Sequence, residues 1–169
     1  MKKTFTLFMV ALMAMLMADE FPEMDIDRVI RMCLVHDIGE AVTGDIPTFL
    51  KTDADRAVEG REVEALTGSL PAPWPEWLGA LFDEMEALET PEAKLYKALD
   101  RMEAIQSHNE SDISTWLPLE YELNLTYGEK EAAFHPYLAA LRAEMRRDTE
   151  KMIGEARGRE RATESRGQE

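Results

Sequence analysis

The sequence predicts an all-α fold, a bundle of about six helices, from three observations. Apolar residues recur at three- and four-residue spacing through most of the 169 residues. No segment alternates apolar and polar residues with the period of two that half-buried strands show. Proline- and glycine-rich breaks separate the amphipathic stretches. One domain is expected over residues 1–153, long enough to bury a core.

Two apolar helices are predicted at the start of the chain. Residues 4–20 are almost entirely apolar, which predicts a helix that is buried on most sides and ends at Phe21 and Pro22. Asp25 suits the N-cap of a second helix that runs to about residue 37. The apolar stripe of this second helix predicts its buried face, which consists of Ile26, Val29, Ile30, Cys33 and Leu34.

The middle of the chain predicts three more helices. Residues 51–66 are charge-rich and amphipathic, which predicts an exposed helix, and three prolines within residues 67–75 predict a loop after it. Residues 76–88 return to helical spacing. Thr90 before Pro91 is typical of a helix start, and this helix should run to about residue 108. Its predicted buried face consists of Leu95, Ala98, Leu99, Met102 and Ile105.

The C-terminal part predicts a loop, a short helix and a long helix. Residues 109–118 form the loop, which contains Trp116, and residues 119–125 form the short helix. The long helix is expected over residues 132–153. Residues 154–169 are polar with few apolar side chains, so we expect a disordered tail there.

The composition restricts the classes of partner. The net charge of −15 and the lack of a basic stripe argue against long nucleic acid, because a binder of that kind must replace counterions with a basic face. A small anionic substrate is compatible with this charge when a metal sets the local field. Cys33 is the only cysteine and lies in an apolar run, so we expect a buried thiol and a cytoplasmic, reducing compartment.

The N-terminal segment has two interpretations. Lys2 and Lys3 before an apolar stretch are typical of an export signal. A cut after Ala18 would leave Leu16 at a position where signal peptidases favour a small residue, and the stretch is short for a membrane span. The other interpretation, a core helix in a protein without membrane contact, is the one that we favour.

A His-Asp pair at the end of an apolar helix is the main chemical signal in the chain. His36 offers a nitrogen ligand and Asp37 an oxygen ligand, a combination that suits manganese, cobalt, iron or zinc. Glu40 follows one helical turn later, on the same face as the pair. That spacing predicts that Glu40 acts as a general acid or base on water bound to a metal at the pair. A polar helix terminus and a solvated Glu40 are the alternative interpretation.

The longer motif RVIRMCLVHDIGEAVTGDIP, residues 28–47, closely resembles the signature of HD-domain metal-dependent phosphohydrolases. The branch that it resembles most is that of the 5′-deoxynucleotidases, and the resemblance extends from about residue 10 to about residue 151. It implies an HD-domain-like helical bundle of about six helices. It also implies a homodimer whose metal is held by an early His, the His-Asp pair and a later Asp. The pair corresponds to His36 and Asp37.

The resemblance assigns further roles. Asp100 matches the later Asp, and it interrupts the apolar face of its helix, where a carboxylate is costly without a cation. An ion pair with Lys97 or Arg101 is the alternative for Asp100. Glu40 matches the residue that orients or deprotonates the attacking water. Asp45 matches an acidic residue that protonates the leaving group or contacts the sugar, and a helix-ending turn is the alternative for it. Packing is the more typical role of the tryptophans, and Trp116 is the one among them that we expect to border the ligand.

The chain departs from the family pattern at its first ligand. The position of the early His falls on Thr6, and the upstream phosphate-binding Arg has no counterpart in this sequence. One explanation is a chain that is N-terminally truncated relative to the family, and the other is a natural variant with a weakened site. The implied activity is hydrolysis of (deoxy)nucleoside 5′-monophosphates, and the alternative is a non-catalytic helical module for binding or dimerisation.

Overall fold

The structure is a computed structural model that describes residues 2–44 and 51–166. These residues contain seven α-helices of seven residues or more and two of four residues, and they contain no strand. The predicted all-α fold is confirmed. The chain divides into two compact units, residues 1–96 and residues 97–169, and the division falls within one helix.

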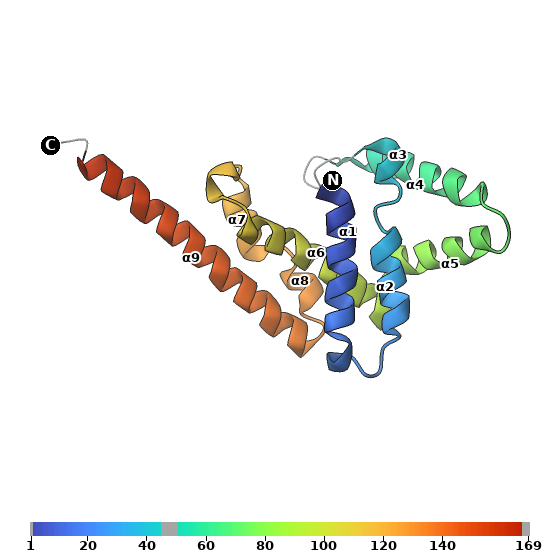
Figure 1. The fold of residues 1–169 in the computed structure, drawn as a ribbon. Helices are drawn as coiled ribbons and strands as arrows, with labels where there is room; N and C mark the ends of the chain where they lie inside the picture. The colour runs from blue at the N-terminus through green and yellow to red at the C-terminus, as the bar shows by residue number, and fades with distance from the viewer. Residues whose placement is uncertain (1, 45–50, 167–169) are drawn as a thin grey trace. The chain divides into compact units, whose positions relative to one another are not determined.

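The first unit begins with a helical hairpin. Helix α1, Lys2–Leu16, packs against α2, Ile26–Val35, and Figure 1 shows the two helices side by side and antiparallel. Asp25 is the N-cap of α2, as predicted, because its carboxylate accepts a hydrogen bond of 3.0 Å from the Arg28 amide. None of the helices in the described ranges is long and apolar enough to cross a bilayer.

The predicted buried face of α2 is partly wrong. Val29 and Cys33 are fully buried, but Leu34 is 52% exposed. Met32, which the predicted stripe did not include, is fully buried. Helix α2 contacts both α1 and α5, so its buried surface is not limited to a single apolar stripe.

Three helices continue the first unit. The four-residue helix α3, Glu40–Thr43, contacts α4, Asp53–Gly68, which in turn contacts α5, Trp74–Ala87. The predicted loop before α5 is shorter than expected, because α5 begins at Trp74. Arg28 of α2 pairs with Glu84 of α5 and thereby ties these two helices together.

Helix α6, Pro91–Glu110, has both predicted features. The hydroxyl of Thr90 accepts a hydrogen bond of 3.2 Å from the Ala93 amide, so Thr90 caps the helix. All members of the predicted apolar face are fully buried, namely Leu95, Ala98, Leu99, Met102 and Ile105.

The second unit contains a 3₁₀ turn at Ile113–Thr115 and the helices α7, Glu120–Thr126, α8, Glu129–Ala132, and α9, Pro136–Arg166. Helices α7 and α8 both contact α9. The buried guanidinium of Arg142 on α9 donates from Nε to the Tyr127 carbonyl at 2.8 Å and from Nη2 to the Asn124 carbonyl at 2.9 Å. Arg142 therefore fixes the end of α7 to α9.

Helix α9 continues beyond the predicted end of the domain. We expected a disordered tail from residue 154, whereas the helix extends through Arg166. Glutamate, alanine and arginine dominate this stretch, and all three are good helix formers. Low apolar content was therefore a poor guide to disorder here. That residues 1–153 form a single domain stays a prediction.

Candidate active site

The His-Asp pair stands where α2 ends. Val35 is the last residue of the helix, and His36 follows it with helical backbone angles. The Nε2 atom of His36 lies 3.2 Å from Oδ1 of Asp37. The His36 side chain is only 4% exposed and that of Asp37 is 22% exposed. The imidazole is therefore buried and the carboxylate is partly buried, so the pair is not a fully solvated helix end.

The other ring nitrogen of His36 fixes the imidazole. Nδ1 lies 2.8 Å from the carbonyl oxygen of Cys33. A carbonyl oxygen can only accept, so Nδ1 carries the proton and donates it. The neutral ring then has its lone pair on Nε2, on the side of Asp37. The ring of Tyr96 packs near the imidazole at a centroid distance of 5.7 Å.

This arrangement fits a cation. In the neutral ring, the Nε2 lone pair and the Asp37 carboxylate are two acceptors that face each other at 3.2 Å. They attract only when a proton or a metal ion lies between them. Histidines that bind metals commonly donate their second N–H to a carbonyl, as His36 does. The donor set of one imidazole and one carboxylate suits a divalent transition metal.

Two donors do not complete a metal site. Within residues 2–44 and 51–166, no group of three or more His, Cys, Asp or Glu side chains is found at metal-binding distance. Thr6, the position that matches the family's first His, lies on α1 and is partly buried. The structure therefore pairs His36 with Asp37, and further ligands remain predictions.

Asp100 lies on α6 in the second unit. Its Oδ2 atom is 2.8 Å from Nζ of Lys97, so the ion pair that we weighed as the alternative is formed. The Asp100 side chain is partly buried, at 22% exposure. That Asp100 joins His36 and Asp37 at a metal stays a prediction.

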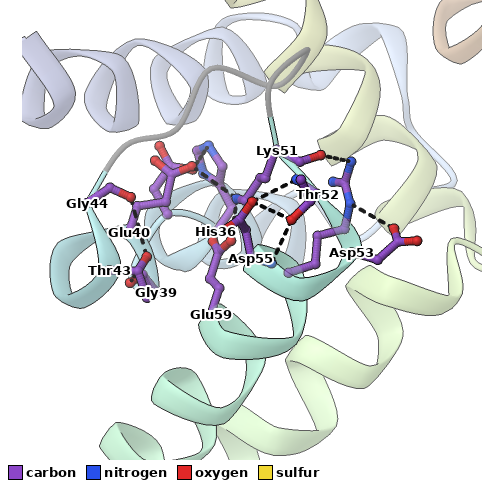
Figure 2. A network of polar contacts seen from close by, with 12 residues as sticks. His36, Gly39, Glu40, Thr43, Gly44, Lys51, Thr52, Asp53, Asp55 and Glu59 are labelled. Atoms are coloured by element: carbon purple, nitrogen blue, oxygen red, sulfur yellow. Dashed lines mark hydrogen bonds and ion pairs between the residues drawn. The ribbon is translucent and has the colours of Figure 1, made fainter.

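Glu40 begins α3, close to the His-Asp pair in sequence. Its side chain is only 15% exposed, so the alternative of a solvated helix residue is wrong. Its Oε1 atom lies 3.5 Å from Nζ of Lys51, and Lys51 also pairs with Glu59 of α4. Figure 2 shows Lys51 between these two carboxylates, near His36.

Sequence reasoning missed Lys51 and Glu59. The charge-rich stretch that contains them was interpreted as an exposed helix, yet both side chains are largely buried. A signal was available at Gly39, within the motif. A Cβ atom there would lie 2.6 Å from Cγ of Glu59, so this glycine marks a close approach of α4.

The two predicted substrate residues have different outcomes. Asp45 lies outside the described residues. Trp116 is 7% exposed and packs with Ile113 and Ile153 in the second unit. Its indole N–H donates to the carbonyl of His108 and the hydroxyl of Ser111. These contacts give Trp116 a packing role, and its contact with substrate stays a prediction.

Comparisons with known proteins agree with the motif. A protein-family model described as HD domain matches residues 7–142. The 5′-deoxynucleotidase HDDC2 of Homo sapiens is 31% identical over 106 residues, which are 62% of this chain and 51% of that protein. The HDDC2 of Xenopus laevis is 37% identical over 102 residues, 59% of this chain and 49% of that protein. The chain spans about half the length of the curated relatives it matches.

A solved structure is also similar. A crystal structure of a predicted metal-dependent phosphohydrolase from Magnetospirillum magnetotacticum MS-1 aligns with a TM-score of 0.71 and 28% sequence identity. The alignment covers 87% of this chain and 76% of that chain. The family model covers most of the chain and includes the buried His36–Asp37 pair. The protein therefore belongs to the HD domain family.

Proposed function

We propose that the protein is a metal-dependent phosphohydrolase that converts (deoxy)nucleoside 5′-monophosphates to nucleoside and phosphate. The observation that carries this proposal is the buried His36–Asp37 pair, with Nε2 of the imidazole 3.2 Å from the carboxylate and Nδ1 held by the Cys33 carbonyl. The similarity to 5′-deoxynucleotidases supports the choice of substrate.

His36, Asp37 and Asp100 are the residues that we expect to hold the metal, which is cobalt, manganese, iron or zinc. A divalent ion of this kind polarises a phosphoryl oxygen and lowers the pKa of bound water. Three protein ligands are enough for a catalytic site when solvent or substrate completes the coordination. Thr6 supplies no imidazole, so the affinity should be lower than that of a site with four protein ligands.

Glu40 is the proposed general base. It accepts a proton from the water whose oxygen forms the new bond to phosphorus, while the bond from phosphorus to the 5′ oxygen breaks. The 5′ oxygen leaves with a proton, and we assign Asp45 as the donor of that proton. The products are the nucleoside and inorganic phosphate. The burial of Glu40 supports this role, because a base in a partly dry site is held in place.

The proposal also covers the class of substrate, the oligomeric state and the cellular compartment of the enzyme. The acidic chain fits a single small nucleotide better than a long nucleic acid. Homodimerisation and a cytoplasmic location are further parts of the proposal, taken from the family resemblance and from the single buried cysteine.

An Asp37→Ala variant tests the proposal. It removes one of two paired donors, so metal content measured by elemental analysis and phosphate release should both be lost. Asp27→Ala, an exposed aspartate on α2, is the matched control and should retain both. Turnover that persists in Asp37→Ala at the wild-type rate would contradict the assignment.

A non-catalytic helical module is the second candidate. Thr6 at the position of the family's first His favours it, because this substitution removes a ligand. The two candidates differ in one measurable property. The module binds or dimerises but releases no phosphate at any metal concentration.

A further inference from the structure

Lys51 connects two carboxylates that belong to different helices. Its Nζ atom lies 3.5 Å from Oε1 of Glu40, at the start of α3, and pairs with Oε2 of Glu59 on α4. All three side chains are largely buried, with exposures of 14% for Lys51, 15% for Glu40 and 18% for Glu59. An ion pair that is shielded from solvent restricts the movement of its side chains more than a pair on the surface does.

The backbone beside Lys51 is fixed by the start of α4. Thr52 and Asp55 form a capping box, in which the Asp55 amide donates to the Thr52 hydroxyl and the Thr52 amide donates to the Asp55 carboxylate. Lys51 is the residue before this cap. Its position is therefore defined by a structured helix end, as Figure 2 shows.

Close packing holds Glu59 against the turn that precedes Glu40. A Cβ atom on Gly39 would lie 2.6 Å from Cγ of Glu59 and 2.8 Å from Cγ2 of Val63. Gly39 has ordinary helical backbone angles, so its small size, and not its conformational freedom, is what this contact uses. The absent side chain lets α4 pack against this turn, which brings Lys51, just before the start of α4, within reach of Glu40.

The charges agree with this geometry. Burial lowers the pKa of Lys51, but the hydrogen bond that its ammonium donates to Glu59 and the charges of Glu59 and Glu40 raise it, and the net pKa is raised. The ammonium group therefore stays charged at neutral pH. One cation between two carboxylates attracts both, so each limits the movement of the other.

We propose that Lys51 is a positioning residue for Glu40, held in place by Glu59. This inference rests on the proposed function, in which Glu40 is the general base. By holding Oε1, the ammonium sets the orientation in which the Glu40 carboxylate meets the attacking water. A base displaced by about 1 Å can lose about 100-fold in rate, so positioning of this kind has a measurable effect.

The first test compares the steady-state kinetics of Lys51→Met and Lys51→Arg with those of the wild type. We expect Lys51→Met to lower kcat about 10- to 100-fold with KM within about twofold, and Lys51→Arg to recover part of kcat. Metal content should be unchanged in both variants. Lys94→Met, at an exposed lysine of α6, is the matched control and should keep the wild-type constants.

Two results would overturn the inference. A large rise in KM with kcat unchanged would make Lys51 a direct ligand of the substrate phosphate. Unchanged kcat and KM would show that Lys51 has no role in the reaction. Glu59→Gln provides a second variant. It should also lower kcat, but by less than Lys51→Met does, because it loosens the Lys51 side chain without removing the charge of Lys51.

A double-mutant cycle separates this inference from the proposed function. Lys51→Met, Glu40→Gln and the double variant are compared in urea unfolding. Non-additive shifts in the unfolding midpoint are expected, because the two side chains interact directly. Additive shifts would contradict the positioning contact. An inactive wild-type enzyme with non-additive shifts would refute the proposed function alone.

Discussion

The Nε2 atom of His36 lies 3.2 Å from Oδ1 of Asp37 in the first unit, where the imidazole is buried and the carboxylate is partly buried. The pair is local in sequence, but its orientation depends on the Cys33 carbonyl one helical turn earlier, which fixes the proton on Nδ1. Two adjacent residues and one backbone oxygen therefore prepare a site for a cation.

Glu40→Gln should separate metal binding from catalysis. The amide keeps the shape of the side chain but cannot take a proton, so kcat should fall about 10²- to 10⁴-fold. Metal content should stay at the wild-type level, because Glu40 is not among the proposed ligands. Elemental analysis and a phosphate-release assay measure the two quantities. Loss of the metal in Glu40→Gln would show that Glu40 is a ligand instead. Glu64→Gln, at an exposed position of α4, is the control.

Thr6→His should strengthen the metal site. The added imidazole restores the ligand that the family motif places at this position on α1. Metal affinity, measured by titration with cobalt, should rise, and turnover at limiting metal should rise with it. The same change combined with Glu40→Gln should raise affinity without restoring turnover. An unchanged affinity in Thr6→His would mean that position 6 does not face the metal.

Arg142→Met should destabilise the second unit. The substitution leaves the carbonyls of Tyr127 and Asn124 without their buried donor, which predicts a loss of about 2–4 kcal/mol in the free energy of unfolding. Urea denaturation measures this loss. The exposed Arg147 offers a control, because Arg147→Met should change stability by less than about 0.5 kcal/mol. Equal stabilities of the two variants would contradict the assigned role of Arg142.

Glu84 should make folding stability depend on acid pH. The hydrogen bond from Arg28 lowers the pKa of Glu84, burial opposes this shift, and the Thr90 hydroxyl adds to it. A carboxyl whose pKa is lower in the folded state stabilises the fold above its unfolded pKa, near 4.5. That contribution is lost as the pH falls through the folded pKa.

The Glu84→Gln variant tests this linkage. Its deficit in unfolding free energy relative to the wild type should be largest near neutral pH and should shrink below about pH 4.5. Urea denaturation at several pH values gives the comparison, and Glu86→Gln, at an exposed position of α5, is the control. A deficit of constant size across the acid range would rule out the Arg28–Glu84 pair as its source.

Local sequence signals predicted the helix starts and much of the core. Asp25 and Thr90 act as caps, because a capping side chain bonds to amides two or three residues away. The buried face of α6 was predicted in full, since one uninterrupted stripe carries it. Leu34 was placed wrongly because α2 has two neighbours, and sequence periodicity does not say how many helices will pack against a face.

Only the part of the candidate site whose residues are close together in the sequence was predictable. His36 and Asp37 are adjacent, and Glu40 follows within one turn, so spacing alone placed them together. Lys51 and Glu59 reach Glu40 because α4 packs against the turn at Gly39, which is a tertiary contact that a single sequence does not reveal. The helical stretch after residue 153 was missed because low apolar content was weighed above helix propensity.

Metal content and phosphate release of the purified wild-type protein decide whether it is a metal-dependent phosphohydrolase. The protein is assayed with a panel of deoxynucleoside 5′-monophosphates, with and without added cobalt or manganese. The account predicts near-stoichiometric metal and release of phosphate, both of which a chelator should abolish. A protein that binds no metal and releases no phosphate at any concentration of added metal would contradict it.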